Sequence, residues 1–460
     1  MEIKQDKLTL GRICCTTLFS LFTAVIFVCV METHLAAQVS FTLSSSPAVG
    51  TNPRGVISAD VNGDGAPDLI SANQSPITGN TLSVLTNNGT GGFATAATLS
   101  AGSQPYSVAA ADVNADGKID LICANMNANS ITVFTNNGSG GFAGLITVTV
   151  GTKPKCVIAR DVNGDGLPDL ITANSTAATL SILLNQGSGS YFTGVASSPA
   201  TGTGPACVAA ADVNGDGKVD LISANVSDST RAFTVLTNNG TGTFSAATSP
   251  NNFFGSQWIT ASDVNGDGRM DLICVGSPSG ANAVSIYTNT AASTFLLSST
   301  AATGTTPYAV VAVDINGDNK VDLVTANQGN NTMTILTNNG GGAFALALSA
   351  TVGSGPEALT AADVNLDGKL DLITANWNVA TLSVMTNNTA FPSPTLGVTT
   401  SGNSVTVSWP SSFDGWTLQQ KSDLSDVSWS PSGGVTNNGT NKSFSISAPT
   451  GNQFFRLSKP

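Results

Sequence analysis

Short apolar runs recur along residues 38–391, separated by turns rich in glycine, asparagine and proline. Runs of about four to eight residues between such turns are typical of β-strands, and no helical apolar period accompanies them. In one recurrence the pattern predicts strands over 107–111, 121–124, 130–135 and 142–150, the last two joined by an Asn-Gly turn. The chain is therefore expected to be all-β.

A short acidic string, D-x-N-x-D-(G/N)-x-x-D-L, recurs seven times at spacings of 49 to 52 residues. A phenylalanine stands 19 or 20 residues before each leading aspartate, and a proline stands seven residues before six of them. Seven units of four antiparallel strands predict a seven-bladed β-propeller, in which closure of the ring removes exposed sheet edges. A β-solenoid is the alternative. The leading aspartates are Asp60, Asp112, Asp161, Asp212, Asp263, Asp314 and Asp363.

The two ends of the repeat array complement each other. The last unit reaches Phe391 and is then broken by Pro392 and Pro394, so its fourth strand is missing. Residues 39–46 carry Phe41 at the fourth-strand position, yet they precede the first acidic string. We therefore expect this N-terminal strand to complete the last blade and close the ring.

Each acidic string places oxygen-bearing side chains at positions 1, 3, 5 and 9 of a tight loop, with a turn residue at position 6. Alternate side chains and the carbonyl at position 7 converge inside such a loop, and Ca²⁺ prefers an all-oxygen cage of this kind. The sequence thus predicts up to seven structural Ca²⁺ sites. The predicted ligands are Asp60, Asn62, Asp64, Ala66, Asp68, Asp112, Asn114, Asp116, Lys118, Asp120, Asp161, Asn163, Asp165, Leu167, Asp169, Asp212, Asn214, Asp216, Lys218, Asp220, Asp263, Asn265, Asp267, Arg269, Asp271, Asp314, Asn316, Asp318, Lys320, Asp322, Asp363, Asn365, Asp367, Lys369 and Asp371, with the position-7 residue of each loop contributing its backbone carbonyl.

The charge census agrees with this interpretation. The formal net charge is −12, and 21 of the 29 acidic residues lie in the seven loops. Such a balance argues against nucleic-acid binding, which requires clustered lysine and arginine. Three further acids lie in the N-terminal segment. The remaining five are Asp228, Glu357, Asp414, Asp423 and Asp426.

The N-terminus predicts a secretory signal over residues 1–37. Lys4, Lys7 and Arg12 precede an uncharged apolar run at 13–30, and small residues at 36–37 offer a cleavage site. The protein is then secreted, extracellular or on the cell surface, with no transmembrane segment in the mature chain. The alternative is an uncleaved membrane anchor.

Cleavage would also remove the only histidine, His34, and with it imidazole-based catalysis. The four cysteines of the mature chain are Cys123, Cys156, Cys207 and Cys274, each within an apolar strand. A cysteine in this setting usually behaves as a small buried hydrophobe, so we expect free thiols, with a disulfide as the alternative.

At the acidic strings the chain resembles the FG-GAP/VCBS repeat family, to which the propeller of integrin α subunits belongs. The resemblance spans about 350 residues and rests on segments such as A-D-V-N-G-D-G-K-V-D-L-I-S-A-N at 211–225. It implies a seven-bladed propeller, Ca²⁺ between the first two strands of each blade, and roles in extracellular adhesion and binding. The sequence departs from the pattern at Ala115, Leu366 and Asn319, and no gap between units holds an inserted ligand-binding domain.

After the prolines the pattern changes, and residues 392–460 alternate apolar and polar positions. This predicts a small β-sandwich of immunoglobulin or fibronectin-III type. The segment resembles C-terminal modules of secreted bacterial repeat proteins that end in F-F-R-L, here 454–457. Its tryptophans are expected in the core.

The residue that follows the turn proline varies from unit to unit, while its neighbours repeat. Because this position begins the innermost strand, the variation predicts a recognition surface on the face opposite the calcium loops. Drift at an unconstrained exposed position is the alternative explanation of the variation. We expect a monomeric propeller that binds an extracellular glycan or protein in adhesion. A lyase acting on polysaccharide, with Lys155, Tyr106 or Tyr308 as base, and a purely architectural role are the alternatives. The candidates are Arg54, Tyr106, Lys155, Gln257, Trp258, Tyr308, Glu357 and Trp377, with Ala206 as the fourth unit's member.

Overall fold

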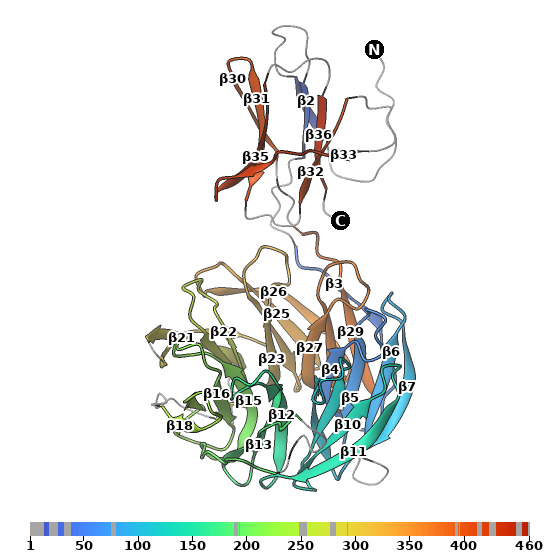
Figure 1. Ribbon diagram of the computed structural model, residues 1–460, viewed down its shortest axis with the longest axis vertical. Helices are drawn as coiled ribbons and strands as arrows, with labels where there is room; N and C mark the ends of the chain where they lie inside the picture. The colour runs from blue at the N-terminus through green and yellow to red at the C-terminus, as the bar shows by residue number, and fades with distance from the viewer. Residues whose placement is uncertain are drawn as a thin grey trace. The chain divides into compact units, whose positions relative to one another are not determined.

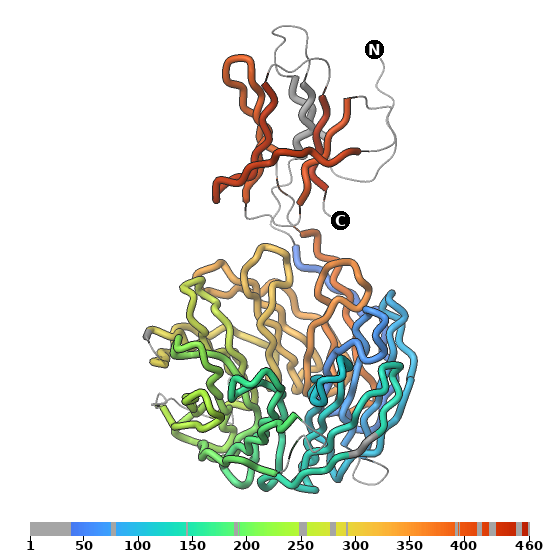
Figure 2. Tube along the Cα trace, in the orientation of Figure 1, coloured from blue at the N-terminus to red at the C-terminus, as the bar shows by residue number. Residues whose placement is uncertain are grey.

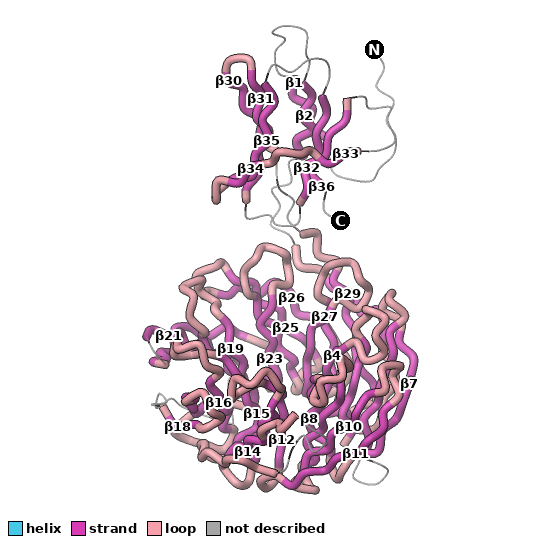
Figure 3. Tube along the Cα trace, viewed as in Figure 1, coloured by secondary structure: helices cyan, strands magenta, loops and turns pink. Residues whose placement is uncertain are grey.

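The computed structural model describes residues 13–17, 26–31, 38–74, 80–187, 192, 194–247, 255–276, 282–291, 293–391, 394, 396–411, 416–422, 429–447 and 453–458. Every regular element in these residues is a β-strand (Figure 3). None of the described residues forms a helix long and apolar enough to cross a membrane. The chain divides into two compact units, one of which is Val39–Ala390.

The unit Val39–Ala390 is a seven-bladed β-propeller, as the repeat period predicts (Figure 1). Each blade is one antiparallel sheet whose strands follow in chain order from the centre outward, except that the outermost strand of the last blade comes from the N-terminus. The first three sheets contain β4 (Pro53–Ala59), β5 (Asp68–Asn73), β6 (Thr81–Asn87) and β7 (Phe93–Ser100); β8 (Pro105–Ala111), β9 (Asp120–Asn125), β10 (Ser130–Asn136) and β11 (Phe142–Thr149); and β12 (Pro154–Arg160), β13 (Asp169–Asn174) and β14 (Thr179–Leu183). The other four contain β15 (Pro205–Ala211), β16 (Asp220–Asn225), β17 (Phe233–Asn238) and β18 (Phe244–Ala246); β19 (Trp258–Ser262), β20 (Asp271–Val275), β21 (Ala283–Ala291) and β22 (Thr294–Ala302); β23 (Pro307–Val313), β24 (Asp322–Asn327), β25 (Thr332–Asn338) and β26 (Phe344–Thr351); and β27 (Pro356–Ala362), β28 (Asp371–Asn376), β29 (Thr381–Asn387) and β3 (Phe41–Ser45).

Strand pairing confirms that the N-terminal strand completes the last blade. Strand β3 pairs antiparallel with β29, Phe41 opposite Asn387 and Leu43 opposite Met385. In Figure 2 the blue start of this unit lies beside its orange end. The innermost strand of the last blade, β27, also contacts β4 of the first, so the seven inner strands form a closed circle.

The second strand of each blade is buried along its whole length, because neighbouring blades cover both of its faces. The third blade departs from the predicted four strands. In the described residues, which leave out 188–191 and 193, its outer edge is formed by isolated bridges, Thr179 with Ala200 and Ile182 with Ser197, rather than by a fourth strand. Pro199 lies between these bridges and has no amide hydrogen for a continuous ladder. The four cysteines of the propeller are free and buried, as expected.

An asparagine at the end of each third strand links its blade to the preceding one. In the described residues all seven asparagines donate from Nδ2 to a buried main-chain carbonyl in the preceding blade's acidic loop, over 2.7 to 3.0 Å. The first blade is linked to the last in the same way, by Asn87 donating to the Val364 carbonyl. The donors are Asn87, Asn136, Asn185, Asn238, Asn289, Asn338 and Asn387.

Replacing one of these asparagines is expected to destabilise the propeller. Asn238 donates to the carbonyls of Val162 and Val219 at 2.7 and 2.9 Å. Asn238→Ala leaves both carbonyls without these donors, which costs about 2–4 kcal/mol. Urea unfolding should detect that loss, while the control Asn239→Ala, at an exposed position of the same turn, should lose under about 1 kcal/mol. Equal losses in the two variants would contradict an inter-blade role.

The second unit comprises Met1–Gln38 and Phe391–Pro460 and has two sheets around one core. Val407, Trp409, Leu418 and Phe455 are buried between the sheets, so Trp409 lies in the core as expected. Trp416 and Trp429 are only half-buried and lie outside this core, contrary to the expectation. Its immunoglobulin or fibronectin-III type stays a prediction. One sheet contains β30 (Gly397–Ser401), β31 (Ser404–Pro410), β35 (Asn441–Ser447) and β34 (Thr436–Asn437); the other contains β1 (Ile13–Thr17), β2 (Ile26–Met31), β36 (Gln453–Ser458), β32 (Thr417–Lys421) and β33 (Ser430–Pro431). Strands β1 and β2 lie within the segment predicted as a signal, which also stays a prediction.

Candidate functional site

The acidic loops connect the first and second strands of each blade and are wound around their own carboxylates. In the first loop the two oxygens of Asp60 accept hydrogen bonds from the amides of Gly63 and Gly65, at 2.7 and 2.8 Å. Asn62 Oδ1 accepts from the Asp64 amide at 2.9 Å. These bonds hold the side chains of positions 1 and 3 against the loop backbone.

The aspartate at position 9 is fully buried in every loop and also has a structural role. Asp68 Oδ2 accepts from the Val61 amide of its own loop, and Oδ1 accepts from the Asn87 amide at 2.8 Å. Asn87 in turn donates to the preceding blade, so each loop is bonded to the asparagine that links the blades. The sequence pattern identified the aspartate as a ligand but gave no sign of this second role.

The donor set fits a hard cation. Burial, opposed by two backbone hydrogen bonds, raises the pKa of Asp68, and the nearby charges of Asp64 and Asp60 raise it further. Burial likewise raises the pKa of Asp322 to about 6. Oxygen-only donors of this kind suit Ca²⁺ rather than a softer metal.

The loop backbone is left-handed at both positions 4 and 6. Asn319 takes the position-6 conformation at φ 62°, which asparagine tolerates better than most residues. Ala115 and Leu366 occupy position 4 at φ 57° and 60°. The Leu366 side chain is 55% exposed, as expected of an outward position, but its backbone costs about 1–2 kcal/mol relative to glycine.

In five loops a lysine or arginine at position 7 pairs with the carboxylate at position 5, at 3.3 to 3.9 Å. These pairs are largely exposed, so each contributes under about 1 kcal/mol. The prediction used only the backbone carbonyl of position 7 and did not include this contact. The cations are Lys118, Lys218, Arg269, Lys320 and Lys369.

The variable residues gather at the other end of the inner strands. Arg54 is the second residue of β4, whereas Asp60 follows the end of that strand, so the two groups lie at opposite ends. A central cavity of about 530 Å³ is lined by residues from all seven inner strands. Trp377 joins the group through its ring, which lies 3.7 Å from the Arg54 guanidinium carbon. We call the following residues the mouth cluster: Arg54, Tyr106, Lys155, Gln257, Trp258, Tyr308, Glu357 and Trp377.

One half of the mouth cluster is a closed hydrogen-bonded network. Arg54 Nη1 pairs with Glu357 Oε2 and donates to the Tyr308 hydroxyl at 3.1 Å. The hydroxyls of Tyr308 and Tyr106 are 2.7 Å apart. Arg54 Nε donates to Gln74 Oε1 at 3.0 Å. The network therefore connects the first, second and last two blades.

The charges of this network are balanced internally. Glu357 is 1% exposed and also accepts from Gln328 Nε2. Burial raises the pKa of Glu357 to about 7, against the lowering effect of Arg54. Because Arg54 has Glu357 within ion-pair distance and an aromatic ring on its face, its charge is compensated inside the protein.

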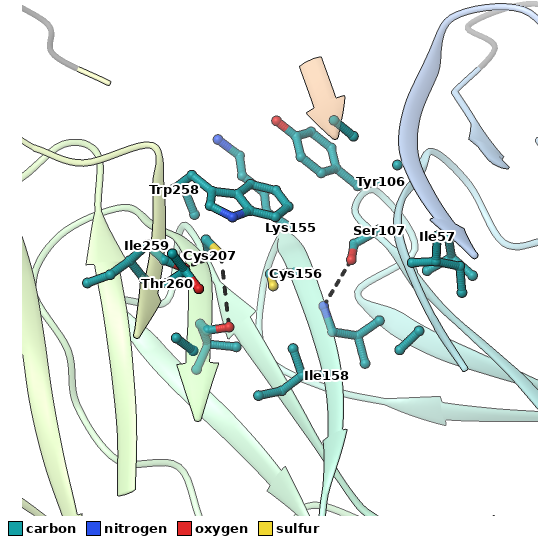
Figure 4. A pocket seen from close by; sticks show the side chains of 18 of the residues that line it. Ile57, Tyr106, Ser107, Lys155, Cys156, Ile158, Cys207, Trp258, Ile259 and Thr260 are labelled. Carbon is teal, nitrogen blue, oxygen red and sulfur yellow. Dashed lines mark hydrogen bonds between the residues drawn. The ribbon is translucent and has the colours of Figure 1, made fainter. Parts of the chain in front are cut away.

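The cluster residues Lys155, Gln257 and Trp258 lie outside this network and line the cavity beside Tyr106. Figure 4 shows Lys155, Tyr106 and Trp258 around this space, above Cys156 and Cys207. Burial and the Arg54 charge lower the pKa of Lys155. Burial raises the pKa of both Tyr106 and Tyr308, so their hydroxyls keep their protons. Of the three candidate bases, only Lys155 has a pKa shifted in the direction that favours the neutral, proton-accepting form.

Two members of the network were missed from the sequence. Gln74 and Gln328 follow the repeated Ala-Asn pair at the end of a second strand, the same position that Trp377 occupies. This position also varies between units, so it forms a second column beside the first. Asp228 and Glu357, the two acidic residues of the propeller outside the acidic loops, have separate partners, since Asp228 accepts from Thr230 and Glu357 pairs with Arg54.

Solved structures confirm the fold at low sequence identity. BBS1N, crystallised in complex with ARL6DN, is similar with a TM-score of 0.55 and 14% identity, over 78% of this chain and 99% of that one. A putative 6-phosphogluconolactonase from Bacteroides fragilis has a TM-score of 0.52 and 18% identity, over 67% of this chain and 86% of that one. No curated protein matches the chain.

The fold and the seven acidic loops define a repeat-built β-propeller. The FG-GAP-like repeat matches six overlapping windows that together span more than half of the chain, and the chain therefore belongs to this family. The windows are residues 60–123, 112–172, 161–223, 212–274, 263–325 and 314–374.

Proposed function

We propose that the chain is an exported binding protein whose calcium-stabilised propeller recognises an extracellular glycan or protein through the mouth cluster. The observation that carries the proposal is the central cavity of about 530 Å³, within the size range of ligand sites. The seven inner strands deliver residues of different chemistry to one place. A ring that needed only to fold could use the same residue in each blade.

In this proposal the two ends of the inner strands have different functions. Calcium in the acidic loops stabilises the scaffold, and the mouth cluster at the other end contacts the ligand. Aromatic and charged residues are the types that dominate recognition sites. A partly rigid set such as Arg54, Tyr308 and Glu357 loses little conformational freedom when a ligand arrives.

Replacing Tyr106, Tyr308 and Trp377 together by alanine is expected to weaken ligand binding by at least about tenfold, because the two tyrosines line the cavity and Trp377 packs on Arg54 of the network. An array of glycans and matrix proteins, probed with the calcium-loaded protein, identifies the ligand and measures the loss. The control is Leu346→Ala, an exposed residue of an outer strand. If the folded triple variant bound as well as the parent, recognition would belong to the C-terminal unit.

A further inference from the structure

The mouth cluster carries one uncompensated positive charge. Arg54 and Glu357 neutralise each other, whereas the Lys155 ammonium has no ion pair among the described residues. Lys155 Nζ lies over the Tyr106 ring, 5.8 Å from the ring centroid. Lys155 is half-buried, and burial with the repulsion of Arg54 lowers its pKa. A cation held in this way gains most from an anionic ligand.

The surroundings of Lys155 indicate what kind of anion fits. Trp258 and Tyr106 line the same cavity as the lysine (Figure 4). Gln257, beside Trp258, adds an amide that can both donate and accept. Aromatic faces suit the C–H faces of a pyranose ring, and hydroxyl and amide groups suit its hydroxyls. A carboxylate on the same ring would meet the ammonium.

We infer that the mouth cluster binds an acidic sugar unit, with the Lys155 ammonium holding its carboxylate. The inference rests on the proposed function and narrows it to one class of ligand. Lys155 is then the residue that selects acidic over neutral glycans. The formal net charge of the chain is −12 before any cation binds, so the selectivity depends on the local charge of Lys155 and not on the net charge of the protein.

The test uses a panel of immobilised uronate and sialylated oligosaccharides, each beside its methyl ester, and a hexaglutamate peptide. We expect the full chain in calcium to bind at least one acidic sugar, and to bind its methyl ester at least about tenfold more weakly, as a lost charged hydrogen bond predicts. The Lys155→Met variant should bind the acidic sugar at least about tenfold more weakly than the parent. The Lys155→Arg variant should retain most of the affinity. Raised salt should weaken binding to the parent protein.

Lys153→Met is the matched control, since Lys153 lies two residues away and donates to Asn127 instead. Its binding should equal that of the parent, and melting curves should show that both methionine variants fold. Three outcomes overturn the inference: no acidic sugar binds, the methyl ester binds equally, or Lys155→Met binds equally. Binding of hexaglutamate alone overturns it in favour of an acidic peptide. The proposed function survives each of these if a neutral ligand from the array still requires Tyr106, Tyr308 and Trp377.

Discussion

A chain that starts at residue 48 should melt well below one that starts at residue 38 and should aggregate at concentrations where the longer chain is soluble. The segment between them contains β3, the outer strand of the last blade. Its loss exposes the β29 edge and uncovers core residues that Val39 and Phe41 cover. One buried and one partly buried apolar side chain, together with several ladder hydrogen bonds, contribute about 5–10 kcal/mol, close to the whole stability of a typical domain.

The closing strand offers a test of cause that a melting curve alone does not. A synthetic peptide of residues 38–47 added to the truncated chain should restore part of the lost melting temperature, and a scrambled peptide should not. Leu43→Ala is a control within the strand, because Leu43 is 52% exposed, and it should change stability by less than about 1 kcal/mol. An identical melting curve for the two chain lengths would show that β3 is dispensable for the ring.

The repeat predicted the fold because it records local geometry many times over. In the second blade the expected strand at 107–111 became Pro105–Ala111, and the expected strand at 130–135 became Ser130–Asn136. The missing fourth strand of the last unit and the Phe41 position were enough to predict ring closure. The prediction was less accurate for the third blade. The repeat period predicts a continuous fourth strand there, but Pro199 interrupts its ladder of hydrogen bonds.

The sequence predicted the site residues that occupy one variable position of the repeat. It did not predict which of them contact each other across different blades. The variable position after the turn proline identified Arg54 and Glu357 as candidates. Nothing in the sequence indicates that these two residues, 303 positions apart, form an ion pair. Ring closure alone brings the first and last blades together. Gln74 and Gln328 could have been found by the same rule, applied to the position after the Ala-Asn pair. The inter-blade role of the asparagine was not predicted, because an Asn-Asn-Gly segment is also typical of a turn.

Chelation of calcium should lower the melting temperature by many degrees. Extracellular sites of this type bind Ca²⁺ with Kd near 10⁻⁴ to 10⁻³ M, so at millimolar calcium each site contributes roughly 0.4 to 1.4 kcal/mol. Seven sites then contribute roughly 3 to 10 kcal/mol, as much as a typical domain's whole stability. Without the ion, each loop keeps a buried aspartate beside two like charges, as at Asp68 with Asp64 and Asp60.

Variants of a single loop distinguish the effect of a lost calcium ion on stability from the effect of the substitution itself. Asp216→Ala removes a carboxylate from one loop and should lower the calcium content by about one ion and the melting temperature by a fraction of the chelation effect. Lys218→Ala is its matched control, because the lysine contacts Asp216 through an exposed pair while only its backbone is a predicted ligand. Elemental analysis and melting with and without EDTA measure both. Because each loop is bonded to the asparagine linking its blade to the preceding one, chelation should also increase cleavage by proteases. A protein that contains no calcium and melts identically in EDTA would leave the acidic loops as hydrogen-bonded turns alone.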